Sequence, residues 1–262
     1  MKRSWGARLC AVTVVSTLSL ALITGCSSDG SKKDKGSKGS GSGAGSSASS
    51  SAPAAAALTS AELEKLLLAQ GEVKGYKVTS GDDTLPKSKT EVKTDKAACD
   101  PLAWATAALA PGDTDANASN SVAEDKASTA TTSPEDLADA FNIDMTFVGL
   151  SSYAGDGAEK AMKAVSDGVT ACAGGYGLAA AGENSKVTKV TSEKGTGGGD
   201  EAIAFAEDVD MDGEGTATFH TEVIRKGNTI ATFYTVNFAA LASGDATEIP
   251  AAVVQAQVAK LK

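Results

Sequence analysis

The sequence predicts an α+β fold in which helices pack on an antiparallel sheet. Apolar residues recur at helical spacing over residues 158–172, while charged residues take the remaining positions, which is typical of an amphipathic helix. In the last third of the chain, the predicted strands 216–225 and 229–238 flank a Lys-Gly-Asn turn suited to a hairpin. A final helix is expected from about Pro250. Helices together with consecutive antiparallel strands indicate the α+β class.

Shorter patterns predict the remaining elements. Leu58 and a capping box formed by Thr59 and Glu62 predict a first helix that ends at Gly71. Ahead of the central helix the sequence predicts a strand at 76–79, a loop at 80–98, a helix at 100–109, a loop at 110–120, a strand at 121–131, a helix at 133–141 and a strand at 145–153. After the central helix it predicts strands at 187–193 and 202–209, joined by a glycine-rich link at 195–199.

Residues 1–25 have the three parts of an export signal. Three basic residues precede an apolar run at 11–23 that is too short to span a bilayer comfortably, and small residues follow it. The order Ile-Thr-Gly-Cys ending at Cys26 resembles the lipobox of bacterial lipoproteins. The resemblance implies cleavage before Cys26 and a diacylglycerol on its thiol, whose two acyl chains give stable anchoring in membrane lipid. The alternative is an ordinary cleaved signal followed by an incidental cysteine.

Residues 26–57 are expected to form a disordered tether. They consist mostly of Ser, Gly, Ala and Lys with almost no apolar bulk, so they cannot bury enough surface to offset the entropy of ordering. A flexible coil of this length spans about 30 Å. The predicted organisation is therefore a signal peptide at 1–25, a lipidated tether at 26–57 and one α+β domain at 58–262, held at the extracytoplasmic face of the cell membrane.

The charge of the predicted domain excludes one class of partner. Residues 1–57 carry seven of the 24 basic residues and two of the 33 acidic ones, so residues 58–262 have a formal charge of −14. An excess of acid of this size argues against binding to nucleic acid and against lying flat on an anionic membrane.

Two cysteines, Cys99 and Cys172, fall within the predicted domain. In an exported chain an isolated pair most simply forms a disulfide. Such a bridge closes a long loop and is expected to stabilise the fold by about 4 kcal/mol in the chain-entropy model. Free thiols and half of a metal site are the alternatives.

One acidic segment has part of a metal-binding pattern. Asp208, Asp210 and Asp212 alternate ahead of Gly213, as in the first half of a calcium-binding loop. The twelfth position, however, is Phe219 rather than glutamate, and the flanking residues are predicted to form strands rather than helices. We interpret the segment as a solvated acidic hairpin turn and keep weak calcium binding as the alternative. No other cofactor is predicted.

The sequence contains no catalytic motif. His220 is the only histidine and lies in the middle of a predicted strand, on the face opposite Phe219, without a nucleophile motif beside it. The glycines at 195–199 lack the strand–loop–helix setting and the lysine of a phosphate-binding loop. We therefore expect a protein that is not an enzyme.

The order of these pieces resembles the PknH-type extracellular sensor domains, which occur in some actinobacterial Ser/Thr kinases and in stand-alone secreted lipoproteins. The resemblance is carried by the helix beginning at Leu58 and Thr59, the Cys-Asp-Pro-Leu turn at 99–102, the segment 149–175 and the C-terminal hairpin. It implies a non-enzymatic domain with a cleft for an unidentified ligand. The chain departs from the pattern because it has one cysteine pair where two disulfides are expected, and it contains neither a kinase nor a transmembrane helix with which to signal inward.

Three functions follow as hypotheses, in this order. The first is a surface-tethered module that binds a small molecule, a wall fragment or a partner in a cleft. The second is a structural or interaction lipoprotein that contacts another envelope protein through a sheet edge or its acidic face. The third is a hydrolase, which would need a nucleophile and base that the sequence does not supply.

Overall fold

The computed structural model describes residues 56–81, 85–114, 116–126, 142–180, 182–211 and 215–262. Within them lies an antiparallel sheet of nine strands in the order β1-β3-β4-β9-β8-β7-β6-β5-β2. The strands are β1 (Tyr76–Ser80), β2 (Val92–Thr94), β3 (Asn117–Glu124), β4 (Met145–Ser152), β5 (Tyr176–Ala180), β6 (Glu183–Glu193), β7 (Glu201–Asp210), β8 (Thr216–Lys226) and β9 (Thr229–Val236). The predicted α+β class with an antiparallel sheet is confirmed.

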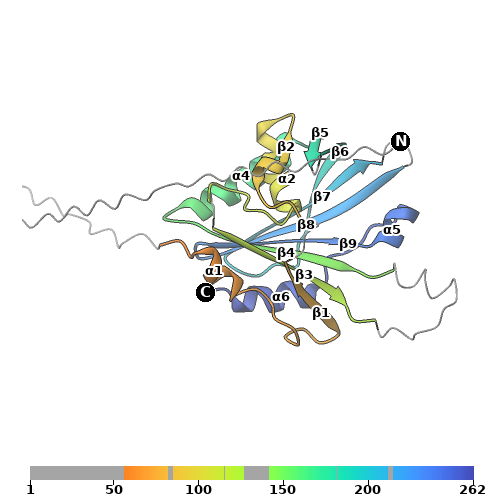
Figure 1. The fold of residues 1–262 in the computed structure, drawn as a ribbon. Coiled ribbons are helices and arrows are strands. Elements are labelled where there is room, and N and C mark those ends of the chain that lie inside the picture. The colour runs from red at the N-terminus through yellow and green to blue at the C-terminus, as the bar shows by residue number, and fades with distance from the viewer. Residues whose placement is uncertain (1–55, 82–84, 115, 127–141, 181, 212–214) are drawn as a thin grey trace, which may run out of the picture. The chain divides into compact units, whose positions relative to one another are not determined.

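Helices cover both faces of this sheet (Figure 1). The helices in the described ranges are α1 (Ser60–Glu64), α2 (Asp100–Thr106), α4 (Gly157–Ala171), α5 (Phe238–Ser243) and α6 (Ala251–Lys260), with 3₁₀ turns η1 (Lys89–Glu91) and η2 (Ala97–Cys99). Helices α2 and α4 pack on one face, while α1 and α6 pack on the other. None of the helices in these ranges is long and apolar enough to cross a membrane.

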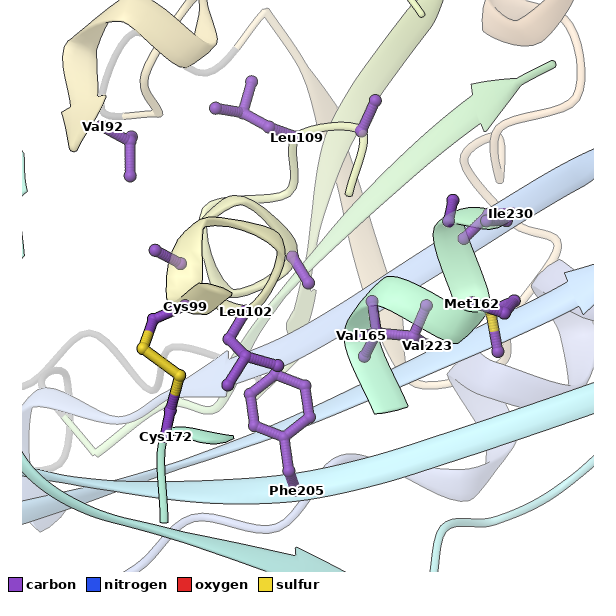
Figure 2. Close-up of a cluster of buried hydrophobic side chains, with 14 of the residues drawn as sticks. Val92, Cys99, Leu102, Leu109, Met162, Val165, Cys172, Phe205, Val223 and Ile230 are labelled. Carbon is purple, nitrogen blue, oxygen red and sulfur yellow. A yellow bond between two sulfur atoms is a disulfide. The ribbon is translucent and has the colours of Figure 1, made fainter. Parts of the chain in front are cut away.

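The core under α2 and α4 contains the predicted disulfide. Cys99 directly precedes α2, Cys172 caps the end of α4, and a bond joins their sulfur atoms. Both cysteines are fully buried, and they belong to the same apolar cluster as Leu102 and Phe205 (Figure 2). The bridge therefore joins two helices that cover one face of the sheet, and the alternatives of free thiols and half of a metal site are excluded.

The opposite core joins α6 to the segment that follows α1. The valines of α6 pack against the apolar residues of β3, β4, β8 and β9. The buried side-chain amide of Gln257, also on α6, accepts a hydrogen bond from the Leu68 N–H at 3.0 Å and donates to the Leu66 carbonyl at 2.8 Å. A side chain from the end of the domain thus fixes the backbone near its beginning.

Helix α1 is shorter than the sequence predicts. Its capping box is present: the Glu62 N–H donates to the Thr59 hydroxyl, and the Glu62 carboxylate accepts from the Thr59 N–H. The helix ends at Glu64, however, and not near Gly71. The amide of Gln257 takes the Leu66 and Leu68 backbone groups that a longer helix would pair internally, so a distant contact overrides the local pattern.

Several predictions for individual elements need correction. The predicted loop at 80–98 contains η1, β2 and most of η2, and the predicted loop at 110–120 contains the start of β3. Strand β5 was not predicted, and Phe238, predicted to end a strand, begins α5 because Asn237 caps that helix. The predicted helix at 133–141, the end of the strand at 121–131, the signal peptide and most of the tether lie outside the described residues.

Candidate functional site

A polar pocket lies on the α6 face of the sheet, over strands β6, β7 and β8. Its volume is about 370 Å³. The loop after β6 and the segment that precedes α6 contribute its other walls. Residues that line it include Glu193, Gly195, Ala204, His220, Glu222 and Glu248.

The register of the sheet places two carboxylates on either side of a small residue. Glu193 at the end of β6 lies opposite Ala204 of β7, and Ala204 lies opposite Glu222 of β8. Residues in register across a sheet point to the same face, so the three side chains form one row. Ala204 lines the pocket between the two glutamates, and the backbone of Gly195 comes close to its methyl group.

His220 and Glu193 form a pair at the wall of the pocket. The Nδ1 atom of His220 lies 2.7 Å from Oε2 of Glu193, and their side chains are 20% and 33% exposed. The Nε2 atom of His220 is buried and has no hydrogen-bond partner among the described residues. His220 faces away from Phe219, as predicted, and is part of the same strand face as Glu222.

Glu222 is the most deeply buried carboxylate of the pocket. Its residue is 2% exposed, and its Oε1 accepts a hydrogen bond from the Gly197 N–H at 2.9 Å. No lysine, arginine or histidine in the described part of the chain forms an ion pair with it. Burying a charge without a partner of opposite charge is unfavourable, so a positively charged group in the pocket would stabilise this carboxylate.

The loop after β6 reaches this carboxylate because it is rich in glycine. A Cβ atom at Gly195 would stand 2.4 Å from Oε1 of Glu222 and 3.2 Å from Cβ of Ala204. Only a residue without a side chain allows the backbone so close. The glycine-rich segment that the sequence predicts as a link between strands therefore also forms a wall of the pocket.

A second buried carboxyl group lies on the other face of the sheet, beneath α2. The Tyr176 hydroxyl donates to Oε1 of Glu207, and the Thr106 Oγ1 lies 2.8 Å from Oε2 of Glu207 and 2.9 Å from the Thr221 Oγ1. Burial raises the pKa of Glu207 above its ordinary value. This network is enclosed in the core and has only hydroxyl partners, so we assign it to the packing of α2 on the sheet.

The acidic segment predicted as a hairpin turn or a calcium site begins inside the sheet. Asp208 and Asp210 are residues of β7, and the Thr218 hydroxyl donates to Oδ1 of Asp208 at 2.8 Å. Asp212 lies outside the described residues. Within the described ranges, no three or more His, Cys, Asp or Glu side chains are grouped so that they could hold a metal ion. Weak calcium binding stays a prediction, as does lipidation of Cys26, which also lies outside the described residues.

The pocket contains no arrangement for nucleophilic catalysis in the described part of the chain. Among the described residues, His220 is paired with a carboxylate, and no serine, threonine or cysteine side chain is hydrogen-bonded to its ring. Cys99 and Cys172 are joined to each other. The described lining is a concave surface with three carboxylates and one lysine.

Sequence reasoning considered His220 and rejected it as a catalytic residue, and it missed the other residues of the pocket. The signal for Glu222 was available, because residues two apart on a strand share a face. Glu193 could be found only by pairing β6 with β7 in the observed register, and the contribution of Gly195 depends on a close approach that no local pattern encodes.

Comparison with known proteins finds similarity among solved structures. No protein-family model matches the chain, and no curated protein matches it. Among solved structures the chain is similar to the extracellular domain of PknH from Mycobacterium tuberculosis, with 14% sequence identity and a TM-score of 0.44. The similarity covers 78% of this chain and 95% of that chain.

Proposed function

We propose that the protein is an exported lipoprotein whose folded domain binds a small polar ligand, without catalysis, at the extracytoplasmic face of the cell membrane. The lipobox-like sequence ending at Cys26 supports the anchor and the location. The disulfide between Cys99 and Cys172 agrees with an oxidising compartment outside the cytoplasm. The resemblance of the sequence to PknH-type sensor domains points in the same direction.

The observation that supports the binding function most strongly is the burial of Glu222 without an ion pair in the described part of the chain. This carboxylate is almost completely buried, has one backbone hydrogen bond and lacks an ion pair in the described part of the chain. It also lines a pocket of about 370 Å³, a volume within the range of small-molecule sites. A structural role would favour a neutral or paired side chain here, whereas a binding role accounts for a charge held at a cavity.

The same pocket supports a non-catalytic function. His220, the only histidine of the chain, is paired with Glu193, and the pocket offers no hydroxyl or thiol hydrogen-bonded to it in the described ranges. If this histidine acted as a general base it would need a free ring nitrogen facing the reacting group, and its Nδ1 atom is already paired with Glu193. Binding therefore accounts for the side chains present more simply than hydrolysis.

An envelope interaction protein is the second candidate, supported by a different observation. The exposed large hydrophobic residues in the described ranges are Met211, at 41%, and Phe238, at 59%. Both follow strand ends that lie at the end of the sheet opposite the β8–β9 turn, where Asn228 binds the Ala56 carbonyl. This apolar end is therefore distant from the end of the sheet where Ala56 is bound, and it offers a contact surface to other envelope proteins.

Native mass spectrometry of the full chain tests the binding function. The protein is released from the membranes of its own cells in a neutral detergent, and its mass is compared under native and denaturing conditions. We expect a small molecule that leaves on denaturation and is absent from Ala204→Leu, which fills the floor of the pocket. Equal native and denatured masses would contradict binding at this pocket. So would an adduct that Ala204→Leu retains.

A further inference from the structure

The pocket carries an excess of negative charge. Three carboxylates, those of Glu193, Glu222 and Glu248, line it, against a single lysine, Lys194. His220 adds a positive charge only when it is protonated, and even then the sum stays negative. A concave surface with this charge repels anionic ligands and attracts cations.

Neither of the two central carboxylates is neutralised by a lysine or arginine of the described chain. Lys194 is exposed and forms no ion pair with any acid within 4.0 Å in the described ranges. Glu193 has His220 as its partner, and Glu222 has only the Gly197 N–H. Among the described residues the Oε2 atom of Glu222 has no hydrogen-bond partner, so an acceptor remains available at the pocket.

The geometry of the row suits a ligand that reaches both glutamates. The backbones at Glu193 and Glu222 are two strand spacings apart, about 10 Å. A short chain with a cationic group at one end or at both ends can contact these carboxylates from the pocket that both of them line. A metal ion is a poorer fit, because the described side chains form no group of ligands close enough to hold one.

The lining also distinguishes between kinds of cation. Quaternary ammonium groups carry no N–H donors and are recognised by aromatic cages. No phenylalanine, tyrosine or tryptophan lines this pocket. Carboxylates form their strongest contacts with N–H donors that carry a positive charge. We propose that the ligand carries primary amine or guanidinium groups that bind Glu222 and Glu193, a proposal that rests on the pocket being the binding site.

The single histidine provides a direct measurement. The full chain, in a neutral detergent, is labelled with ¹³C in the histidine ring, which yields signals from His220 alone. Four probes with the same four-carbon backbone are titrated: butane-1,4-diamine, its bis-trimethylammonium analogue, butane-1,4-diol and succinate. We expect saturable shifts of the His220 signals with the diamine and much weaker effects with the other three.

Substitutions test whether the carboxylates cause this preference. Glu222→Gln keeps the acceptor for the Gly197 N–H but removes the charge, and it is expected to weaken diamine binding about tenfold or more. Glu193→Gln is expected to weaken binding in the same direction. Glu183→Gln is the matched control, because Glu183 is an exposed residue on the same strand as Glu193 and outside the pocket.

The outcomes separate this proposal from the function on which it rests. Diamine binding that falls in Glu222→Gln and is unchanged in Glu183→Gln supports it. Equal binding of the diol, succinate or the quaternary analogue, lost in Ala204→Leu, overturns the ligand class while the pocket remains a binding site. If no probe shifts the His220 signals, the amine class is wrong, and the native mass measurement alone then decides whether the pocket binds anything.

Discussion

Gly195 in the loop after β6 lies directly against the carboxylate of Glu222 on β8. A Cβ atom at position 195 would stand 2.4 Å from Oε1 of Glu222, and the Gly197 N–H two residues later donates to that same oxygen. The loop therefore fixes the carboxylate on one side while the pocket opens on another. A glycine-rich connection and a buried charge, 27 residues apart in the chain, form one structural unit.

The contact at Gly195 predicts a specific effect of adding one methyl group. Gly195→Ala is expected to push the loop away from Glu222, lowering the free energy of unfolding by about 1–3 kcal/mol and weakening diamine binding. Chemical denaturation and the His220 titration measure the two effects. Gly174→Ala is the control, since a Cβ atom there meets nothing within 4 Å. Equal stability of the two variants would show that the loop does not rest on Glu222.

The buried Glu207 predicts a dependence of stability on pH. Burial raises its pKa in the folded state, whereas in the unfolded chain it titrates near 4.5. As pH rises above that value the unfolded state releases a proton that the folded state keeps. Folding stability contributed by this group is therefore complete at low pH and declines as pH rises toward the folded pKa.

Glu207→Gln should remove this decline. Glu207 accepts from the Tyr176 and Thr106 hydroxyls. A glutamine keeps an acceptor oxygen for Tyr176, and its amide N–H can donate to the Thr106 oxygen instead. The variant is expected to be at least as stable as the wild type at pH 8, with a flatter slope of unfolding free energy between pH 5 and 8 in urea titrations. Glu183→Gln, which changes an exposed glutamate, should keep the wild-type slope. A steeper slope in Glu207→Gln would contradict the assignment.

The disulfide predicts a large loss of stability on its removal. Replacing Cys99 and Cys172 together by serine is expected to lower the free energy of unfolding by about 4 kcal/mol, because the bridge closes a long loop in the unfolded chain. Urea titrations with and without dithiothreitol give the measurement. The reductant should destabilise the wild type and leave the double variant unchanged; a double variant as stable as the oxidised protein would refute this contribution.

The buried hydroxyl of Tyr153 predicts a late titration. It accepts hydrogen bonds from the Gly112 N–H and the Ser151 hydroxyl, and burial raises the pKa of Tyr153 to about 12. In an ultraviolet titration of tyrosinate, Tyr153→Phe should therefore leave the absorbance change up to pH 11 unaltered and reduce the change above it. A loss of the signal near pH 10 would show that this hydroxyl is accessible to solvent.

The predicted elements that the structure confirms are those for which the local sequence pattern and the burial of the side chains agree. The helix α4 has a regular apolar stripe that ends at a buried cysteine, and the turn at Gly227 joins two adjacent strands, β8 and β9. The three-residue strand β2 pairs with the small-residue strand β5, and β5 also pairs with β6. Both strands depend on this pairing, so no local pattern indicated them. Such non-local contacts also shortened α1.

The candidate site was less predictable for the same reason. His220 and Glu222 share a strand face, which follows from the alternation of side chains alone. Their neighbour Glu193, and the approach of Gly195, depend on strand order and on a loop conformation. The position of Ala204 between the two glutamates can be recognised only once the register of the strands is known.

The thermal stability of Glu222→Gln, with and without butane-1,4-diamine, tests the central claim most directly. If the carboxylate is held for a cationic ligand, the variant without diamine should be at least as stable as the wild type, because an unpaired buried charge has been removed. Saturating diamine should then raise the unfolding temperature of the wild type and leave that of Glu222→Gln nearly unchanged. A variant that is markedly less stable without diamine, or that responds to it as the wild type does, would show that Glu222 serves the fold and not a ligand.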